Sequence, residues 1–256
     1  MNGALAGRTV VVTRPSAQAG ALCRAIEAAG GQAFCFPALE IVPVSDADAF
    51  APVAAQLDGF DIAFFVSPNA VEHGLAGLRK IRSWPTGLRV AAVGPGSVRA
   101  LGEHGFADVL APENGFDSEA VLALPAFAPE AVRGRAVLIL RGGGGRELLG
   151  ETLAARGARV EYLSCYRRRC PEADPAPLLA LVARGKADAL SLTSSEGVDN
   201  LARLVGGEGL ARLAALPVFV PHPRIAARCR HHGWERIVVS EGGDNALLRA
   251  LVEFFG

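Results

Sequence analysis

Short apolar runs alternate along the whole chain with stretches of helical periodicity. The runs predict strands at 8–13, 32–36, 62–66, 89–93 and 108–111 in the first half, and at 135–140, 159–163, 187–192, 217–220 and 236–239 in the second. Uninterrupted apolar runs of this length are typical of parallel strands buried on both faces. Five strands alternating with helices, present twice, predict an α/β protein with two flavodoxin-like, doubly wound parallel-sheet domains.

Local signals predict where several helices begin and end. Ser67 followed by Pro68 is typical of an N-cap and the first helical residue. Asp117 and Asp244 stand where N-caps belong, and Gly30 follows an apolar helical pattern as a left-handed C-cap would. We therefore expect helices to start directly after the carboxyl ends of the strands.

The two halves of the chain match at a constant offset. RTVVVTR from Arg8 and RAVLILR from Arg135 are 127 positions apart, as are Ser67 and Ser194. This spacing predicts an internal duplication. The segments 37–44 and 164–171 correspond in the same way and predict two linker strands. If both cross between domains, one domain contains both chain ends, but the repeat alone fits two contiguous halves equally well.

Composition excludes several classes of function. Lys plus Arg and Asp plus Glu are 26 each, so the formal net charge is zero and general binding of nucleic acid is not expected. No apolar run approaches the ~18 residues of a membrane helix, and the first residues do not read as a secretory signal. The five cysteines show no C-x-x-C spacing, which predicts reduced thiols in a cytoplasmic protein and no metal site.

Small, hydroxylated and arginine residues follow the predicted strands, where open parallel sheets bind their ligands. The candidates for substrate binding are Arg14, Ser67, Ser97, Arg141, Gly142, Ser194, Ser195 and Arg224. Such groups suit a ligand with several dispersed carboxylates or phosphates. Two alternatives stay open: the serines only cap helices, and Arg14 and Arg141 are solvated or in ion pairs. The glycine run 142–145 lacks the third glycine of a dinucleotide fingerprint, so it is a weak nucleotide signal.

Tyr166 breaks the symmetry of the two halves, because its counterpart 127 positions earlier is Leu39. It lies beside three arginines in a segment expected to cross between domains. A phenol has a reference pKa of about 10, so it can donate a proton at neutral pH, and nearby cations adjust its acidity. Tyr166 is therefore a candidate general acid. The alternative is a half-buried aromatic residue of the linker.

Eight short motifs occur in order along the chain. They are VVVTRP from Val10, PALEI from Pro37, FFVSPNAV from Phe64, AAVGPGS from Ala91, VLILRGGGGRE from Val137, YLSCYRRRCP from Tyr162, LTSSEGVDNL from Leu192 and VPHPRIA from Val220. Their order, their spacing and their presence together in one chain resemble the pattern in bacterial members of the uroporphyrinogen-III synthase family, across essentially the whole chain. The resemblance implies a discontinuous domain of residues 1–37 plus 172–256 and an inserted domain of residues 38–171.

The resemblance also implies the reaction. Such enzymes close the linear tetrapyrrole hydroxymethylbilane into uroporphyrinogen III and invert ring D through a spiro intermediate, without a cofactor. Tyr166 matches the family tyrosine proposed to protonate the departing hydroxyl group. Ser97 stands where many members have threonine, and Ser67, Ser194 and Ser195 match substrate-binding turns. A cytoplasmic monomer is expected, with possible handover of substrate from hydroxymethylbilane synthase.

The chain departs from the family pattern at VPHPRIA, where other members have G-P-T-T. The resemblance therefore does not carry a threonine contact over to this chain, and Arg224 is a candidate replacement as a carboxylate partner. Two other functions are alternatives: a two-domain nucleotide-sugar transferase, and a non-catalytic protein that binds an anionic ligand. The missing diphosphate fingerprint argues against the transferase.

Overall fold

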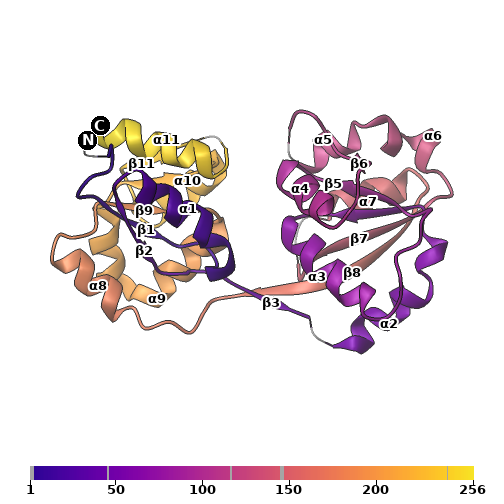
Figure 1. The fold of residues 1–256 in the computed structure, drawn as a ribbon, viewed down its shortest axis with the longest axis horizontal. Coiled ribbons are helices and arrows are strands. Elements are labelled where there is room, and N and C mark those ends of the chain that lie inside the picture. The colour runs from indigo at the N-terminus through magenta and orange to yellow at the C-terminus, as the bar shows by residue number, and fades with distance from the viewer. Residues whose placement is uncertain (1–2, 45, 116, 145–146, 241) are drawn as a thin grey trace. The chain divides into compact units, whose positions relative to one another are not determined.

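The structure is a computed structural model of the 256-residue chain, and it describes residues 3–44, 46–115, 117–144, 147–240 and 242–256. The chain divides into two compact units. Unit 1 contains Met1–Glu40 and Arg169–Gly256, and unit 2 contains Ile41–Arg168. The chain passes between the units twice, once within strand β3 and once within strand β8 (Figure 1).

The elements follow one another in alternating order in both units. Those of unit 1 are β1 (Thr9–Val12), α1 (Ser16–Ala28), β2 (Gln32–Cys35), α8 (Ala176–Ala183), β9 (Ala189–Ser191), α9 (Ser195–Ala214), β10 (Val218–Val220), α10 (Pro223–His231), β11 (Ile237–Val239) and α11 (Asp244–Phe255). Those that lie in unit 2 or lead into and out of it are β3 (Glu40–Pro43), α2 (Ala47–Ala55), the 3-10 turn η1 (Leu57–Gly59), β4 (Ile62–Phe65), α3 (Pro68–Arg79), β5 (Arg89–Ala92), α4 (Pro95–Glu103), β6 (Val109–Leu110), α5 (Ser118–Leu122), η2 (Pro125–Phe127), α6 (Pro129–Val132), β7 (Ala136–Gly142), α7 (Leu148–Ala155) and β8 (Arg159–Arg169).

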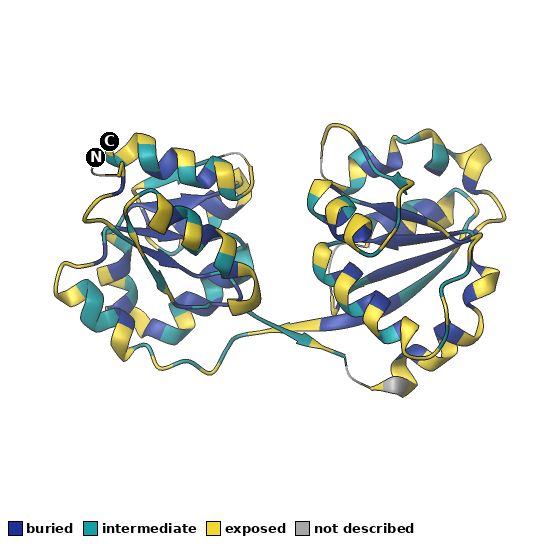
Figure 2. Ribbon diagram, in the orientation of Figure 1, coloured by how far each residue is buried: buried dark blue, intermediate teal, exposed yellow. Residues whose placement is uncertain are grey.

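Unit 1 is a five-stranded parallel sheet with helices on both faces. Its strand order is β11-β10-β9-β1-β2. Val10 and Val12 pack with residues of α1 and α11, whereas Val11 packs with residues of α8, α9 and α10 on the other face. This alternation follows from the two-residue period of a strand, and Figure 2 shows the strands as the buried layer.

Unit 2 has the strand order β3-β8-β7-β4-β5-β6. Phe65 and Leu140 pack with α2, α3 and α4, and Phe64 and Ile139 pack with the helices α5 to α7 on the opposite face. Apart from β3, the strands are arranged as in unit 1, with β7 and β8 in the places of β1 and β2. The expectation of doubly wound α/β units is confirmed.

Strand β8 is longer than the sequence pattern predicts. The pattern ends this strand at residue 163, whereas the structure continues it to Arg169. At the matching place in the first half, Pro37 separates β2 from β3, because proline has no N–H to donate and restricts the residue before it. Ser164, 127 positions later, imposes no such break.

A β-bulge interrupts the pairing of β7 with β8. Arg141 lies opposite Ser164, and the next residue, Gly142, lies opposite Tyr166, so Cys165 is the extra residue. Two consecutive side chains, Cys165 and Tyr166, are consequently both fully buried in the core cluster on the α3 side of the sheet. The bulge therefore determines where Tyr166 lies.

The predicted helix ends are mostly confirmed. Ser67 and Asp117 cap α3 and α5 through their side chains, and Gly30 has a φ of 88° after α1. The prediction for Asp244 is wrong, because Gly243 is the N-cap and Asp244 is the first residue of α11. The carboxylate of Asp244 pairs instead with Arg14.

Candidate functional site

Tyr166 lies at the carboxyl edge of the unit 2 sheet, beside the start of α3. Its hydroxyl group is hydrogen-bonded to Ser67 Oγ at 3.0 Å. The whole side chain is buried, with 0% relative exposure. The alternative of a half-buried linker aromatic is therefore wrong, since Tyr166 is a core residue of unit 2.

Ser67 connects this tyrosine to a helix N-terminus. The residue follows β4 directly, and its Oγ accepts the backbone N–H of Ala70 at 3.1 Å. A serine hydroxyl has two acceptor positions and one donor. If Tyr166 donates to Ser67, both acceptor positions are filled and the Ser67 proton is left for a ligand at the edge of the sheet.

Two further side chains lie next to Tyr166: Arg168, one of the three arginines beside it in the sequence, and His73, for which no sequence motif carries a signal. Nη2 of Arg168 is 3.5 Å from the Tyr166 hydroxyl, and its guanidinium carbon is 5.9 Å from the ring centre. The ring of His73, two turns along α3 from Ser67, lies 6.0 Å from the tyrosine ring. His73 is six positions after Ser67, and residues that share a helix face are three, four or seven apart, so helical spacing does not predict this contact. The bulge explains the position of the phenol.

We expect the stability of unit 2 to decrease as the pH falls through about 6.5. Burial lowers the pKa of His73, against a weaker opposing effect of Glu72. The unfolded chain therefore takes up a proton on this imidazole before the folded chain does, which lowers the free energy of unfolding in acid. Urea midpoints at about pH 7.5 and about pH 5.5 should differ less in His73→Gln than in the parent. An equal shift in both proteins would contradict the prediction.

Gly142 lies against the ring of Tyr166. A Cβ atom at position 142 would be 2.7 Å from Cε2 and Cζ of the tyrosine and 3.1 Å from its hydroxyl oxygen. The backbone N–H of the next residue, Gly143, donates to the Tyr166 carbonyl at 2.8 Å. The sequence places Gly142 in a binding loop, and the structure gives it a packing role that holds the tyrosine in place.

Ser97 lies in the first turn of α4, the helix that follows β5, and β5 neighbours β4 in the sheet. Its side chain is 2% exposed. The amino ends of α3 and α4 approach each other, since a Cβ at Gly96 would lie 3.4 Å from Cγ of Pro68. Two helix N-termini thus adjoin at the edge that carries Ser67, and such termini favour anionic groups.

Arg141, at the end of β7, is engaged in a local cluster. Its Nη1 donates to Glu147 at 2.8 Å, and its guanidinium carbon lies 4.1 Å from the ring centre of Tyr162. Hydrogen bonds from Arg141 and then Tyr162 lower the pKa of Glu147. Arg141 is therefore in an ion pair, as one alternative predicted. A carboxylate of the substrate would compete with Glu147 for the guanidinium group.

The unit 1 candidates lie at the carboxyl edge of their own sheet. Arg14 follows β1 and pairs with Asp244. Ser194 caps α9 by accepting the N–H of Gly197 at 2.9 Å, and Oγ of Ser195 is buried without a hydrogen-bond partner among the described residues. Ser194 is thus a cap, as one alternative predicted, and that role is compatible with ligand binding.

The departure from the family pattern lies at the start of α10. Nδ1 of His222 accepts the backbone N–H of Arg224 at 3.0 Å, so the imidazole caps the helix. Arg224 itself is exposed, and within the described part of the chain no ion pair involves its side chain. Its guanidinium group is therefore accessible to an anionic ligand.

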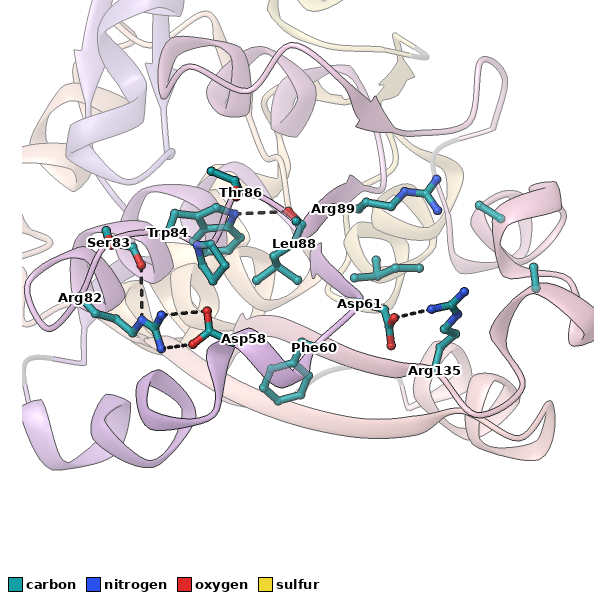
Figure 3. Close-up of a pocket in the computed structure, with 15 residues that line it drawn as sticks. Asp58, Phe60, Asp61, Arg82, Ser83, Trp84, Thr86, Leu88, Arg89 and Arg135 are labelled. Atoms are coloured by element: carbon teal, nitrogen blue, oxygen red, sulfur yellow. Dashed lines mark hydrogen bonds and ion pairs between the residues drawn. The ribbon is translucent and has the colours of Figure 1, made fainter.

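A cavity of about 740 Å³ lies at the opposite, amino-terminal edge of the unit 2 sheet (Figure 3). It is lined by Trp84, Arg89 and two ion pairs, Arg82 with Asp58 and Arg135 with Asp61, each with one contact of 2.7 Å. The ion pairs neutralise most of its charge. None of the predicted site residues lines this cavity, and we do not assign the function to it.

Neither a metal-binding cluster nor a membrane-spanning helix occurs among the residues that the structure describes. No group of three or more His, Cys, Asp or Glu side chains among them is arranged to hold a metal ion. Of the helices in the described ranges, none is both long and apolar enough to cross a bilayer. The candidate residues of each unit are hydroxyl, guanidinium and backbone N–H groups at the carboxyl edge of that unit's own sheet.

Comparison with known proteins decides the family. The profile described as Uroporphyrinogen-III synthase HemD matches residues 20–248. The chain belongs to the uroporphyrinogen-III synthase family. The curated uroporphyrinogen-III synthase of Salmonella typhimurium is 36% identical and aligns over 95% of this chain and 99% of its own length. That of Escherichia coli is 33% identical, with the same two shares.

Solved structures agree on the fold. A mutant uroporphyrinogen III synthase from Thermus thermophilus has a TM-score of 0.64 and 21% identity, covering 96% of this chain and 99% of its own. The Helicobacter pylori enzyme has a TM-score of 0.59 and 14% identity, with the same coverage. The family resemblance inferred from the eight motifs is confirmed. Uroporphyrinogen-III synthases cyclise hydroxymethylbilane in tetrapyrrole biosynthesis, so the transferase and binding-protein alternatives are not favoured.

Proposed function

We propose that this uroporphyrinogen-III synthase closes hydroxymethylbilane with a proton that leaves the Tyr166 hydroxyl and travels through Ser67. The observation that carries this proposal is the 3.0 Å hydrogen bond between a buried phenol and a helix-capping serine. A buried phenol cannot reach a large substrate directly, whereas Ser67 is only partly buried. The serine accepts the tyrosine proton as it gives its own to the departing hydroxyl group of ring A.

The first step leaves a cationic azafulvene and water. The substituted carbon of ring D then attacks this cation and forms the spiro intermediate, whose fragmentation and reclosure give the type III isomer. Because uncatalysed closure gives the symmetrical isomer, the enzyme also has to hold the chain of pyrroles in a bent shape. Positioning and proton donation together account for the chemistry without further groups from the protein.

The carboxylates of the substrate need hydrogen-bond donors, which we place at the carboxyl edge of each sheet. Each pyrrole of the bilane carries an acetate and a propionate, which helix N-termini and arginines bind well. We assign to Ser97, which is 2% exposed, the role of packing the first turn of α4. In unit 2 we assign carboxylate binding to the amino ends of α3 and α4. In unit 1 we assign it to Arg14, Ser194, Ser195 and Arg224, of which Arg224 is free of ion pairs within the described residues. Arg141 completes the set in exchange with Glu147, whereas Gly142 contributes by holding Tyr166 in place.

Ser67→Ala tests the relay. We expect the rate of type III formation to fall roughly 10²-fold, because the path from the phenol to the substrate is interrupted. The free energy of unfolding should decrease by about 1 kcal/mol through loss of the cap. The double variant Ser67→Ala/Tyr166→Phe should form the type III isomer only slightly more slowly than Ser67→Ala alone, because both residues act on one proton. Single-turnover isomer analysis with freshly generated hydroxymethylbilane measures all three variants.

Asp117→Ala is the matched control for the cap. Asp117 caps α5 in the same unit by accepting the Ala120 N–H at 2.8 Å, and it lies away from the tyrosine. The Asp117→Ala protein should lose about as much free energy of unfolding as Ser67→Ala and keep the parent's rate of type III formation. If the effects of Ser67→Ala and Tyr166→Phe simply multiply in the double variant, the two residues do not share one proton path, and the relay is wrong.

The wider setting is also proposed. Five cysteines without a disulfide framework suit a cytoplasmic enzyme, and the spontaneous closure of free hydroxymethylbilane favours handover from hydroxymethylbilane synthase. We propose that the chain acts as a monomer. Sedimentation tests the monomer, fractionation tests the compartment, and transient kinetics with a trapping agent for free bilane test the handover.

A further inference from the structure

We propose that Cys23 and Cys35 are a redox modification site, at which a reversible disulfide bond joins helix α1 to strand β2. The two sulfur atoms are 3.1 Å apart, in direct contact. Both thiols are free in this structure. The residues are 12 positions apart, so the contact arises from how the helix packs on the sheet and not from adjacency along the chain.

The fold directs both side chains to the same layer. Cys23 belongs to the stripe of α1 that faces the sheet, with Ala19, Leu22 and Ile26 buried at helical spacing around it. In β2, Ala33 packs into the same cluster, and Cys35 follows two residues later on the same face. Phe34, between them, packs on the opposite face. The contact is therefore fixed by two regular elements.

The pair is open to a small reagent from one side. Strand β2 is at the edge of its sheet, and Cys35, its last residue, is exposed, whereas Cys23 is half-buried. Cys165 and Cys229 are fully buried, and burial raises the pKa of each to about 12, which leaves them unreactive thiols. Cys35 is thus the place where an oxidant meets the pair.

The chemistry is a thiol–disulfide exchange with a small-molecule disulfide. The Cys35 thiolate attacks one sulfur of the reagent, forms a mixed disulfide and releases one thiolate. Burial and then the neighbouring sulfur of Cys35 raise the pKa of Cys23 to about 12, so Cys23 acts second. Having lost its proton, Cys23 attacks the Cys35 sulfur and displaces the second reagent thiolate. Two protein thiols are oxidised and one reagent disulfide is reduced to two thiols.

The bond would stabilise the part of unit 1 that carries Arg14. Cys35 pairs in register with Val12, two residues before Arg14, and α1 begins two residues after that arginine. Closing this short loop restricts the unfolded chain. We expect the unfolding temperature of unit 1 to rise by about 5–10 °C.

The test oxidises the full folded chain with glutathione disulfide and then alkylates it in denaturant. Three of the five cysteines should be alkylated, and peptide mapping should recover a 23–35 crosslink. A reductant should restore five alkylated cysteines and the original unfolding temperature. Cys35→Ser and Cys23→Ala should abolish the crosslink and the temperature rise. Cys170→Ser, which removes a half-buried thiol near the Asn200 carbonyl, should keep both.

Three results would overturn the proposal. One is a glutathione adduct on Cys35 that never converts to the crosslink. Another is a crosslink that forms as fast in guanidinium chloride as in the folded chain, since the native contact would then contribute nothing. The third is a 23–35 bond that leaves the unfolding temperature unchanged.

Discussion

Tyr166→Phe is expected to lower the single-turnover rate of type III formation about 10²-fold, the lower end of what loss of a general acid costs. The ring stays in the core of unit 2, and Ser67 keeps its bond to the Ala70 N–H, so helix α3 remains capped. Loss of one ordinary hydrogen bond should lower the free energy of unfolding by about 1 kcal/mol. The product should remain mostly type III, because the groups that bend the substrate are unchanged.

The chain offers a matched control for this variant. The chain has one other tyrosine, Tyr162, which lies in the same strand β8. The hydroxyl group of Tyr162 is hydrogen-bonded to Glu147. Tyr162→Phe should lose similar stability while the rate stays within about twofold of the parent. Isomer analysis and thermal unfolding on both variants give the comparison. Equal rates for Tyr166→Phe and the parent would remove the acid role and leave Tyr166 as a core residue.

Gly142→Ala is expected to damage the site through packing alone. The added methyl group would lie 2.7 Å from two ring carbons of Tyr166, closer than such atoms can approach. Either the ring or strand β7 has to move, which should cost about 1–3 kcal/mol of stability. Movement of the ring displaces the phenol from Ser67, and a misplacement of about 1 Å can lower a rate ~10²-fold.

Gly143→Ala separates this effect from a general intolerance of the loop. A Cβ at Gly143 would have its nearest neighbour, Cγ of Arg167, at 3.8 Å, an ordinary contact. Its stability and rate should remain close to those of the parent. Unfolding midpoints in urea and single-turnover rates measure both variants. A Gly142→Ala protein as active as Gly143→Ala would mean that the tyrosine need not stay where the bulge puts it.

Local signals in the sequence were sufficient to predict the elements and the residues that follow each strand, at the edge where we propose that the substrate binds. The strand and helix periods differ, so apolar spacing distinguished the two kinds of element. Ser67 was recognisable as a cap because a cap depends on its own residue and the next three. Since parallel strands end at one edge, residues that follow them, such as Ser97 and Ser194, were predictable candidates without knowledge of packing.

The family motifs also singled out Tyr166, but they could not place it. Sequence alternation treats each residue of a strand as pointing opposite to the one before. The extra residue at Cys165 reverses that alternation, and it is stabilised by pairing with β7, which comes from elsewhere in the chain. The burial of the phenol and its bond to Ser67 are consequences of this reversal.

Long-range pairing decided the remaining features. Asp244 has the character of an N-cap, yet its carboxylate pairs with Arg14, 230 positions earlier in the chain, and the cap shifts to Gly243. Cys23 and Cys35 show no spacing signal, because a helix and a strand bring them together through packing. The sequence by itself determined the order of the elements, most of the caps and the edges at which we propose that the substrate binds, since these depend on neighbours along the chain. The position of the tyrosine, the ion pairs of the arginines and the contact of the two thiols depend on neighbours in space, and only the tertiary structure decided them.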